Sequence, residues 1–252
     1  MAALPHIAYR LEDNLTARHE RIFLTGTQAL VRLLIRQRQR DRDAGWRTAG
    51  FVSGYRGSPL GGVDQAMWRA QSLLQAHDIR FVPAINEDLA ATMVMGSQQA
   101  GVHPQRLVEG VFGMWYGKGP GVDRAGDALH HAHAAGASRK GGVLLIVGDD
   151  HTAASSSIPH ASDATLASWN IPVIHPGSVE DYEHFGLWGW AASRFSGSWV
   201  AFKAITETVE SGRSFVPAEV PDFAMPADLM LQHRREYSPR EFLSPAIEER
   251  ML

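Results

Sequence analysis

The residue with the clearest chemical potential is Glu87, which stands between two predicted elements. It follows an apolar run at residues 80–85 and precedes a helical pattern of small apolar residues at 89–95. A glutamate held there would be partly desolvated, and proton transfer commonly uses such a carboxylate. A structural role is the alternative, because a negative side chain stabilises the positive amino end of a helix. Taken alone, Glu87 supports both roles equally.

A glycine-rich turn at residues 53–62 is the second candidate. It separates an apolar run at 49–52 from a helical pattern at 65–77, for which Asp64 is the expected cap. Glycines let the backbone approach a ligand closely, and an open parallel sheet binds ligands beyond the carboxyl ends of its strands. A tight loop without a ligand is the alternative interpretation.

Two further corners follow apolar runs. The first, at residues 117–123, is again rich in glycine, and the second is the Asp-Asp pair at 149–150, followed by a serine-rich loop at 151–157. Neither glycine-rich corner has the spacing of a phosphate-binding loop or a dinucleotide fingerprint, so a nucleotide site is not expected. Without a Gly-x-Ser-x-Gly turn, the serines are weak candidates for nucleophiles.

Three histidines, His130, His131 and His133, raise the question of a metal site. His130 and His133 share one face of a helix predicted at residues 126–138. No carboxylate accompanies them at a fixed spacing, and packed or exposed histidines are commoner than ligands. The interpretation as surface or packed histidines is favoured, and the sequence predicts no metal site.

The elements that must position these residues form a regular alternation of strands and helices. It predicts an α/β fold, a doubly wound and mostly parallel six-stranded sheet with helices on both faces. Right-handed crossovers would bring Gly54, Glu87, Gly117 and Asp149 to one edge of the sheet. The strands are expected at residues 49–52, 80–85, 108–114, 142–148, 171–176 and 199–204, and the other helices at 28–42 and 179–194.

The ends of the chain differ from this core. Residues 1–21 are expected to be a polar lead-in, residues 22–212 the α/β domain, and residues 213–252 a Pro-rich linker or the truncated start of a next domain. The basic run from Arg32 to Arg42 is interpreted as the solvated face of a helix. A net charge of −3 disfavours nucleic acid as the main partner.

Cysteine content and hydropathy restrict the chemistry further. The chain contains no cysteine, so it offers no thiolate ligand for an iron–sulfur cluster or zinc, and no cysteine nucleophile. Any such group must belong to a partner. We find no signal-peptide pattern and no run long enough for a membrane span, so a cytoplasmic location without membrane contact is expected.

Taken together, the corners resemble the 2-oxoacid:ferredoxin oxidoreductases, and most closely the indolepyruvate type. Residues from about 9 to 212 are covered by the resemblance. The motifs that carry it are LTGTQALVR at 24–32, SGYRGSPLGG at 53–62, NEDLAAT at 86–92, GMWYGKGPGVD at 113–123 and GDDH at 148–151.

The resemblance implies the pyrimidine-binding domain of a thiamine diphosphate enzyme. It assigns Glu87 the role of holding the aminopyrimidine in the tautomer that activates the cofactor. Ser58 and Arg56 are implied to face the bound 2-oxoacid, Arg56 as a donor to its carboxylate. The residues implied to line the cofactor are Gly54, Tyr55, Gly57, Pro59, Gly117 and Lys118.

The resemblance also implies partners, because the reaction is oxidative decarboxylation of an aryl 2-oxoacid to the acyl-CoA. The Gly-Asp-Gly motif that binds Mg²⁺ and the diphosphate is absent, and Ala154 stands where relatives often have Lys. Diphosphate-binding and iron–sulfur domains or subunits are therefore expected, with ferredoxin, CoA and a 2-oxoacid for the assembly, which is expected to be a dimer. The alternative is a non-catalytic orphan domain acting as a dimerisation or ligand-binding module.

Overall fold

The computed structural model describes residues 9–10, 12–18 and 20–223 of the chain. Its centre is a six-stranded sheet with the order β3-β2-β4-β5-β7-β6, in which every neighbouring pair is parallel. This confirms the predicted α/β fold class. The strands are β2 (Thr48–Gly54), β3 (Ile79–Phe81), β4 (Gly110–Lys118), β5 (Val143–Gly148), β6 (Val173–Ile174) and β7 (Val200–Lys203).

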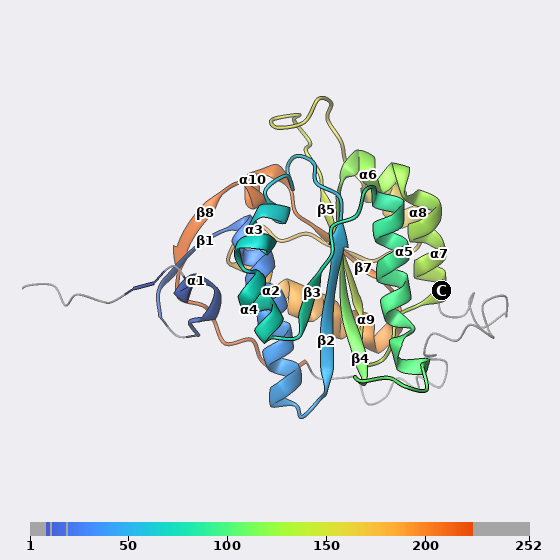
Figure 1. Ribbon diagram of the computed structural model, residues 1–252. Coiled ribbons are helices and arrows are strands. Elements are labelled where there is room, and N and C mark those ends of the chain that lie inside the picture. Colours follow the sequence, from blue (N-terminus) through green and yellow to red (C-terminus); the bar gives the residue numbers. More distant parts are fainter. Residues whose placement is uncertain (1–8, 11, 19, 224–252) are drawn as a thin grey trace, which may run out of the picture.

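Helices cover both faces of this sheet (Figure 1). One face packs against α2 (Gly26–Asp43), α3 (Val63–Arg69), α4 (Gln71–Ala76) and α9 (Asp181–Ser196). The other face packs against α5 (Glu87–Gln98), α6 (Gly119–Arg124), α7 (Gly126–Ala135) and α8 (Asp163–Ser168). Each face has its own apolar cluster, which explains why every residue of β5 is buried.

Shorter elements complete the described part of the chain. Strands β1 (Ile22–Thr25) and β8 (Gly212–Phe215) pair antiparallel beside α1 (Asp13–Thr16), as Figure 1 shows. The remaining elements are η1 (Ala100–Val102) and α10 (Thr206–Val209). The predicted domain boundaries stay a prediction, and residues 224–252 of the expected linker lie outside the described residues. No helix in the described ranges has the length and apolar character needed to cross a membrane.

The basic run of α2 is not a solvated face, contrary to the sequence prediction. Arg32 is 1% exposed, and its Nε lies 2.7 Å from Glu183 of α9. Arg38 is also buried, and it pairs with Asp78 at 2.9 Å. The acidic partners lie 151 and 40 residues away in the sequence, so spacing along α2 gave no sign of them.

Several local predictions were also wrong in detail. Asp64 does not cap a helix: the cap of α3 is Gly62, while the buried Asp64 accepts a hydrogen bond from the Tyr116 hydroxyl. The helix predicted at 65–77 is divided into α3 and α4 at Ala70. Strand β4 continues to Lys118, and α6 begins at Gly119, so the second corner is a junction of strand and helix rather than a loop.

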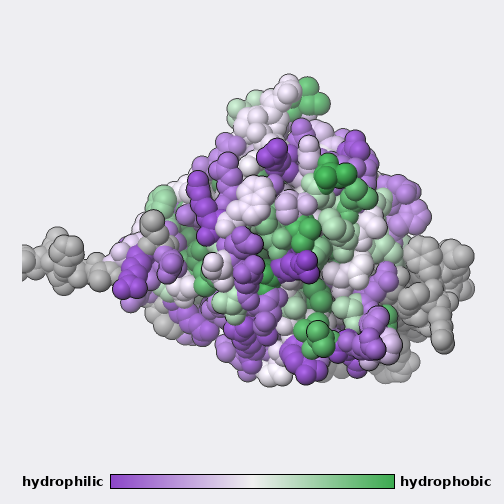
Figure 2. Space-filling model, in the orientation of Figure 1, coloured by the Kyte–Doolittle hydropathy of each residue, from purple (hydrophilic) through white to green (hydrophobic). Residues whose placement is uncertain are grey.

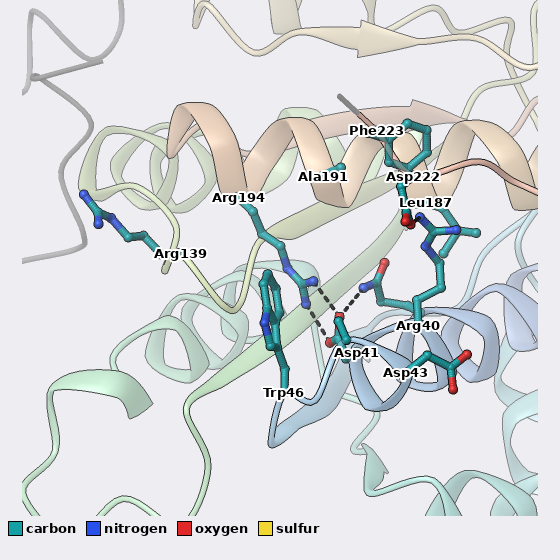
Figure 3. Close-up of a pocket in the computed structure, with 12 residues that line it drawn as sticks. Arg40, Asp41, Asp43, Trp46, Arg139, Leu187, Ala191, Arg194, Asp222 and Phe223 are labelled. Atoms are coloured by element: carbon teal, nitrogen blue, oxygen red, sulfur yellow. Dashed lines mark hydrogen bonds and ion pairs between the residues drawn. The ribbon is translucent and has the colours of Figure 1, made fainter. Parts of the chain in front are cut away.

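A buried ion pair joins the end of α2 to α9. Arg194 donates to both carboxylate oxygens of Asp41, at 2.6 and 2.8 Å, and Gln37 and Thr48 donate to the same carboxylate. Figure 3 shows Arg194 reaching past Trp46 to Asp41, beside a pocket of about 510 Å³. Because Asp41 and Trp46 precede β2 and Thr48 begins it, this pocket lies at the amino end of that strand, away from the glycine-rich corners.

We expect Asp41→Ala to lower the free energy of unfolding by about 3–5 kcal/mol, because Arg194 would stay buried without its partner. Asp43→Ala is the matched control in the same helix. Its side chain is 68% exposed and lies 3.8 Å from Arg18, so the loss should stay below about 1 kcal/mol. Urea unfolding measures both values. Equal losses for the two variants would contradict the proposed importance of the pair.

Candidate functional site

The carboxyl ends of three strands are tied together by backbone hydrogen bonds. Tyr55, directly after β2, donates its N–H to the carbonyl of Tyr116 in β4 at 3.1 Å. Ala84, after β3, donates to the carbonyl of Gly54 at 3.0 Å. Both glycine-rich corners and the segment that leads to Glu87 therefore meet at one edge of the sheet, as the sequence predicted.

Neighbouring atoms approach the backbone so closely at this edge that only glycine fits. A Cβ atom on Gly54 would lie 2.2 Å from the carbonyl oxygen of Tyr116, which no side chain tolerates. A Cβ atom on Gly57 would lie 2.7 Å from Cδ of Lys118, so the two corners are in direct contact. A Cβ atom on Gly117 would lie 2.5 Å from the ring of Trp115. The edge is closed by packing that only glycine permits.

The loop after β5 reaches over the first corner. Ser156 donates its hydroxyl to the carbonyl of Ser58 at 3.2 Å. Pro59 packs near Gly148, where a Cβ atom would lie 3.2 Å from the proline Cδ. Figure 1 shows this loop projecting beyond the sheet. The corner thus has contacts to both β4 and the loop that follows β5.

Glu87 is the first residue of α5 and is 5% exposed. Asn86 caps the helix by accepting from Leu89 N–H at 2.8 Å, and Trp115 donates its indole N–H to the Glu87 carbonyl at 3.1 Å. The carboxylate lies against α6, because a Cβ atom on Gly121 would be 2.6 Å from Glu87 Oε1. The side chain therefore points into the junction beside the second corner and not into water.

One cation partly compensates this buried carboxylate. Arg124 Nε lies 3.7 Å from Glu87 Oε2 and 3.4 Å from Asp88 Oδ2, and the arginine side chain is 56% exposed. Arg124 lies farther from Glu87 than from Asp88. The arginine thus shares its charge with an exposed neighbour and leaves Glu87 with a loose ion pair.

Exposed apolar side chains lie next to this region. Ile85 is 81% exposed and Leu89 is 46% exposed, on either side of Glu87 in the sequence. Figure 2 shows hydrophobic residues gathered over the upper half of α5. Such a patch around a buried carboxylate is typical of a binding surface rather than of a solvated helix.

The structure brings together the six residues implied to line the cofactor, namely Gly54, Tyr55, Gly57, Pro59, Gly117 and Lys118. Ser58 belongs to the same cluster through its carbonyl, and the Arg56 side chain is exposed beside it. Their roles toward a cofactor or substrate stay predictions.

Three polar contacts at this edge were not predicted. Tyr116 and Asp64 form a buried hydrogen bond behind the first corner. His160 bridges Asp123 of α6 at 2.8 Å and Asp149 at 3.3 Å. The sequence marks Asp149 only as a strand end, and nothing in its spacing points to a histidine on the far side of the serine-rich loop.

The three histidines of α7 make separate contacts, and His131 is 59% exposed beside Asp127. His130 stacks on Trp169, and Nδ1 of His133 accepts from Trp199 N–H at 3.1 Å. A separate group, Asp149, His151 and Asp163, has its ligand atoms within 4.8 Å of one another. The Lys203 ammonium contacts both of its carboxylates, so a positive charge already occupies this position.

The serine-rich loop is organised by Asp150. This carboxylate accepts from the N–H groups of Ala154, Ser155 and Ser156 at 2.7 to 2.9 Å. Burial raises the pKa of Asp150, but the hydrogen bonds from these groups outweigh burial and lower the pKa to about 2. The ionised carboxylate therefore holds the loop in the shape that reaches Ser58.

Comparisons with known proteins add a likeness in fold. No family model and no curated protein matches the chain. The structure is similar to that of a solved 2-oxoglutarate:ferredoxin oxidoreductase from Magnetococcus marinus with 2-oxoglutarate, coenzyme A and succinyl-CoA bound. The TM-score is 0.55 at 18% identity, over 81% of this chain and 32% of that chain. The likeness shows a shared fold, and this chain spans about a third of that protein's length.

The position of Glu87 can be tested with a pair of glycine substitutions. Gly96→Ala in α5 should raise the free energy of unfolding by about 0.5–1 kcal/mol, because a Cβ there meets nothing within 4 Å. Gly121→Ala should bring no such gain, because its Cβ atom would push the Glu87 carboxylate out of its position. Urea unfolding and crystal structures of both variants measure the effects. A carboxylate that stays in place in Gly121→Ala would show that the contact is not tight.

The loop should respond to pH through Asp150. Because its pKa is lowered from about 3.9 in an unfolded chain, the carboxylate stabilises the loop fully above about pH 4 and loses this effect as pH falls toward 2. Asp150→Asn should speed hydrogen exchange at Ser155 and Ser156 at neutral pH, and its difference from the unchanged chain should shrink in that acid range.

Exchange measured by NMR, corrected for the intrinsic pH dependence, checks this expectation. Asp127→Asn is the control, since that side chain is 94% exposed and belongs to α7. A difference between Asp150→Asn and the unchanged chain that persists undiminished at pH 2 would contradict the role given to the carboxylate.

Proposed function

We propose that this chain is the pyrimidine-binding part of a thiamine diphosphate-dependent 2-oxoacid:ferredoxin oxidoreductase of the indolepyruvate type. The assembly would decarboxylate an aryl 2-oxoacid oxidatively to the acyl-CoA. The observation that carries the proposal is the buried Glu87 carboxylate at the start of α5, packed against Gly121. The ordered motifs and the fold likeness support it.

The residues present fit an aminopyrimidine. Such a ring needs a carboxylate acceptor on a wall that excludes water. Glu87 supplies the carboxylate, Gly121 packs α6 directly against it, and Gly57 packs the first corner against the side chain of Lys118. Exposed Ile85 and Leu89 supply apolar surface beside it.

When bound, thiamine diphosphate would supply the nucleophilic carbon for attack on the 2-oxoacid. The work of this chain would be to accept a hydrogen bond from the ring at Glu87 and to hold a proton there. Trp115 and Asn86 keep the residue at the helix start by their hydrogen bonds. Arg56 would donate to the substrate carboxylate, with the Ser58 hydroxyl beside it.

Other parts of the reaction would belong to partners. With no cysteine, this chain cannot ligate iron–sulfur clusters through thiolates. The Mg²⁺ and diphosphate site would lie on another domain or subunit, and ferredoxin, CoA and the 2-oxoacid would meet the assembly. We propose a dimer as its basis, located in the cytoplasm.

A non-catalytic domain is the second candidate. The observation in its favour is Arg124, which gives the Glu87 carboxylate an ion pair within the chain itself. On this view Glu87 and Arg124 would stabilise the junction of α5 and α6, and the apolar surface would serve dimerisation or ligand binding. The two candidates differ in whether the carboxylate itself is needed for a reaction.

The test uses a tagged chain purified from its own cells together with the proteins that bind it. Reduction of a viologen dye is followed with indolepyruvate, thiamine diphosphate, Mg²⁺ and CoA. We expect Glu87→Gln to reduce the rate by about 100-fold or more, because the amide cannot take part in proton transfer. Glu87→Asp should also lose activity, since the shorter side chain retracts the carboxylate.

Asp88→Asn is the matched control. It removes the neighbouring carboxylate, which shares Arg124 but is exposed, and should keep most of the activity. Replacing indolepyruvate by 2-oxoglutarate tests the substrate class. Full activity in Glu87→Gln, or no 2-oxoacid-dependent reduction in the purified assembly, would favour the non-catalytic candidate.

A further inference from the structure

A second apolar surface lies at the opposite end of the sheet from β3, where β6 is the edge strand. Val173 and Phe185 are each 36% exposed and Trp188 is 46% exposed. We call this surface the edge hollow: it has a volume of about 370 Å³ and is lined by Val173, Ile174, His175, His184, Phe185 and Trp188.

The edge hollow is built on a helix that is apolar on two sides. Leu187 and Trp190 of α9 are buried in the core, at 1% and 0% exposure, while Phe185 and Trp188 face outward. A surface helix normally presents polar residues on its outer face. Large aromatic side chains there indicate that another segment covers this part of α9.

The last described residues lead to this surface. Arg40 donates to the carbonyl of Val220 at 2.7 Å and lies over the ring of Phe223. The Phe223 ring lies 6.2 Å from that of His184, which lies 5.5 Å from that of Phe185. An aromatic row therefore runs from Phe223, at the end of the described chain, into the edge hollow.

The next stretch of sequence suits the hollow in length and composition. Residues 224–231 read Ala-Met-Pro-Ala-Asp-Leu-Met-Leu, with four large apolar side chains and one carboxylate. Trp188 lies one helical turn beyond His184, about 6 Å along α9. Two residues of extended chain span about 7 Å, so the two residues after Phe223 are long enough to cover this distance. The carboxylate, Asp228, can accept a hydrogen bond from an imidazole N–H of His175 or His184.

We propose that residues 224–231 bind across the edge hollow, so that this stretch is a clamp on α9 and β6 rather than a free linker. Met225, Leu229 and Leu231 would cover Phe185 and Trp188, continuing the row begun by Phe223. The occupant is the chain itself, because the described chain ends on the row that enters the hollow. This inference is independent of the proposed function.

The natural absence of cysteine makes a disulfide test direct. Trp188→Cys is combined with Met225→Cys, Leu229→Cys or Leu231→Cys in the full chain, and each pair is oxidised at low protein concentration. The matched control replaces Trp68, which is 48% exposed on α3, by cysteine together with the same three residues. Non-reducing electrophoresis and peptide mass spectrometry identify the bonds formed.

We expect an intramolecular disulfide in at least one Trp188→Cys pair and in none of the Trp68→Cys pairs. Equal bonding in both sets, no bonding at all, or bonds only between two chains would overturn the proposal, the last result pointing to a second copy on this surface. Hydrogen exchange in cysteine-free chains gives a second measurement. Leu229→Asp should speed exchange in residues 182–190, and the control Glu248→Gln should not; an unchanged rate in Leu229→Asp would also overturn the clamp.

Discussion

The structure of the candidate site depends on close backbone approach at the carboxyl edge of the sheet. Gly54, Gly57 and Gly121 each lie where a Cβ atom would meet a neighbour at less than 3 Å. Removing side chains at these points lets two corners and a helix start converge on one place. The Glu87 carboxylate is buried because Gly121 allows α6 to pack directly over it.

Burial without a tight ion pair gives this carboxylate its chemical interest. A charged group in a dry site is costly unless it is well paired, and Arg124 offers Glu87 only a distant contact. Asp41 shows the contrasting arrangement, because Arg194 binds it through two short hydrogen bonds. One carboxylate is thus saturated within the fold, while the other keeps capacity for a further partner, which is why we place the proposed chemistry at Glu87.

The proposed function and the proposed clamp use different parts of the same layered design. The carboxyl edge gathers corners from β2, β4 and β5, and Glu87 lies against α6, which follows β4. The edge hollow belongs to β6 and α9, the last strand and helix on the other side of the sheet. The first surface would face a partner, whereas the second would be covered by the chain itself, so the two proposals can be tested separately.

The local pattern of the sequence predicted the six strands, the fold class and the convergence of the corners, because strand and helix periodicity are properties of neighbouring residues. It also placed Glu87 at a strand-to-helix turn. It could not predict how far β4 continues, since the glycines of the second corner read as a loop and only packing against β2 and β5 extends the strand to Lys118.

Which charged side chains are buried depends on the tertiary structure. The sequence predicted that Arg32 and Arg38 lie on the solvated face of a basic helix. Both are buried instead, because they form ion pairs with Glu183 and Asp78 of other parts of the fold. Asp64 was predicted to cap a helix, but it accepts a hydrogen bond from Tyr116, which the fold brings next to it from another element. Apolar periodicity fixes which face of an element turns inward, whereas the pairing of charges depends on which distant elements the fold brings side by side.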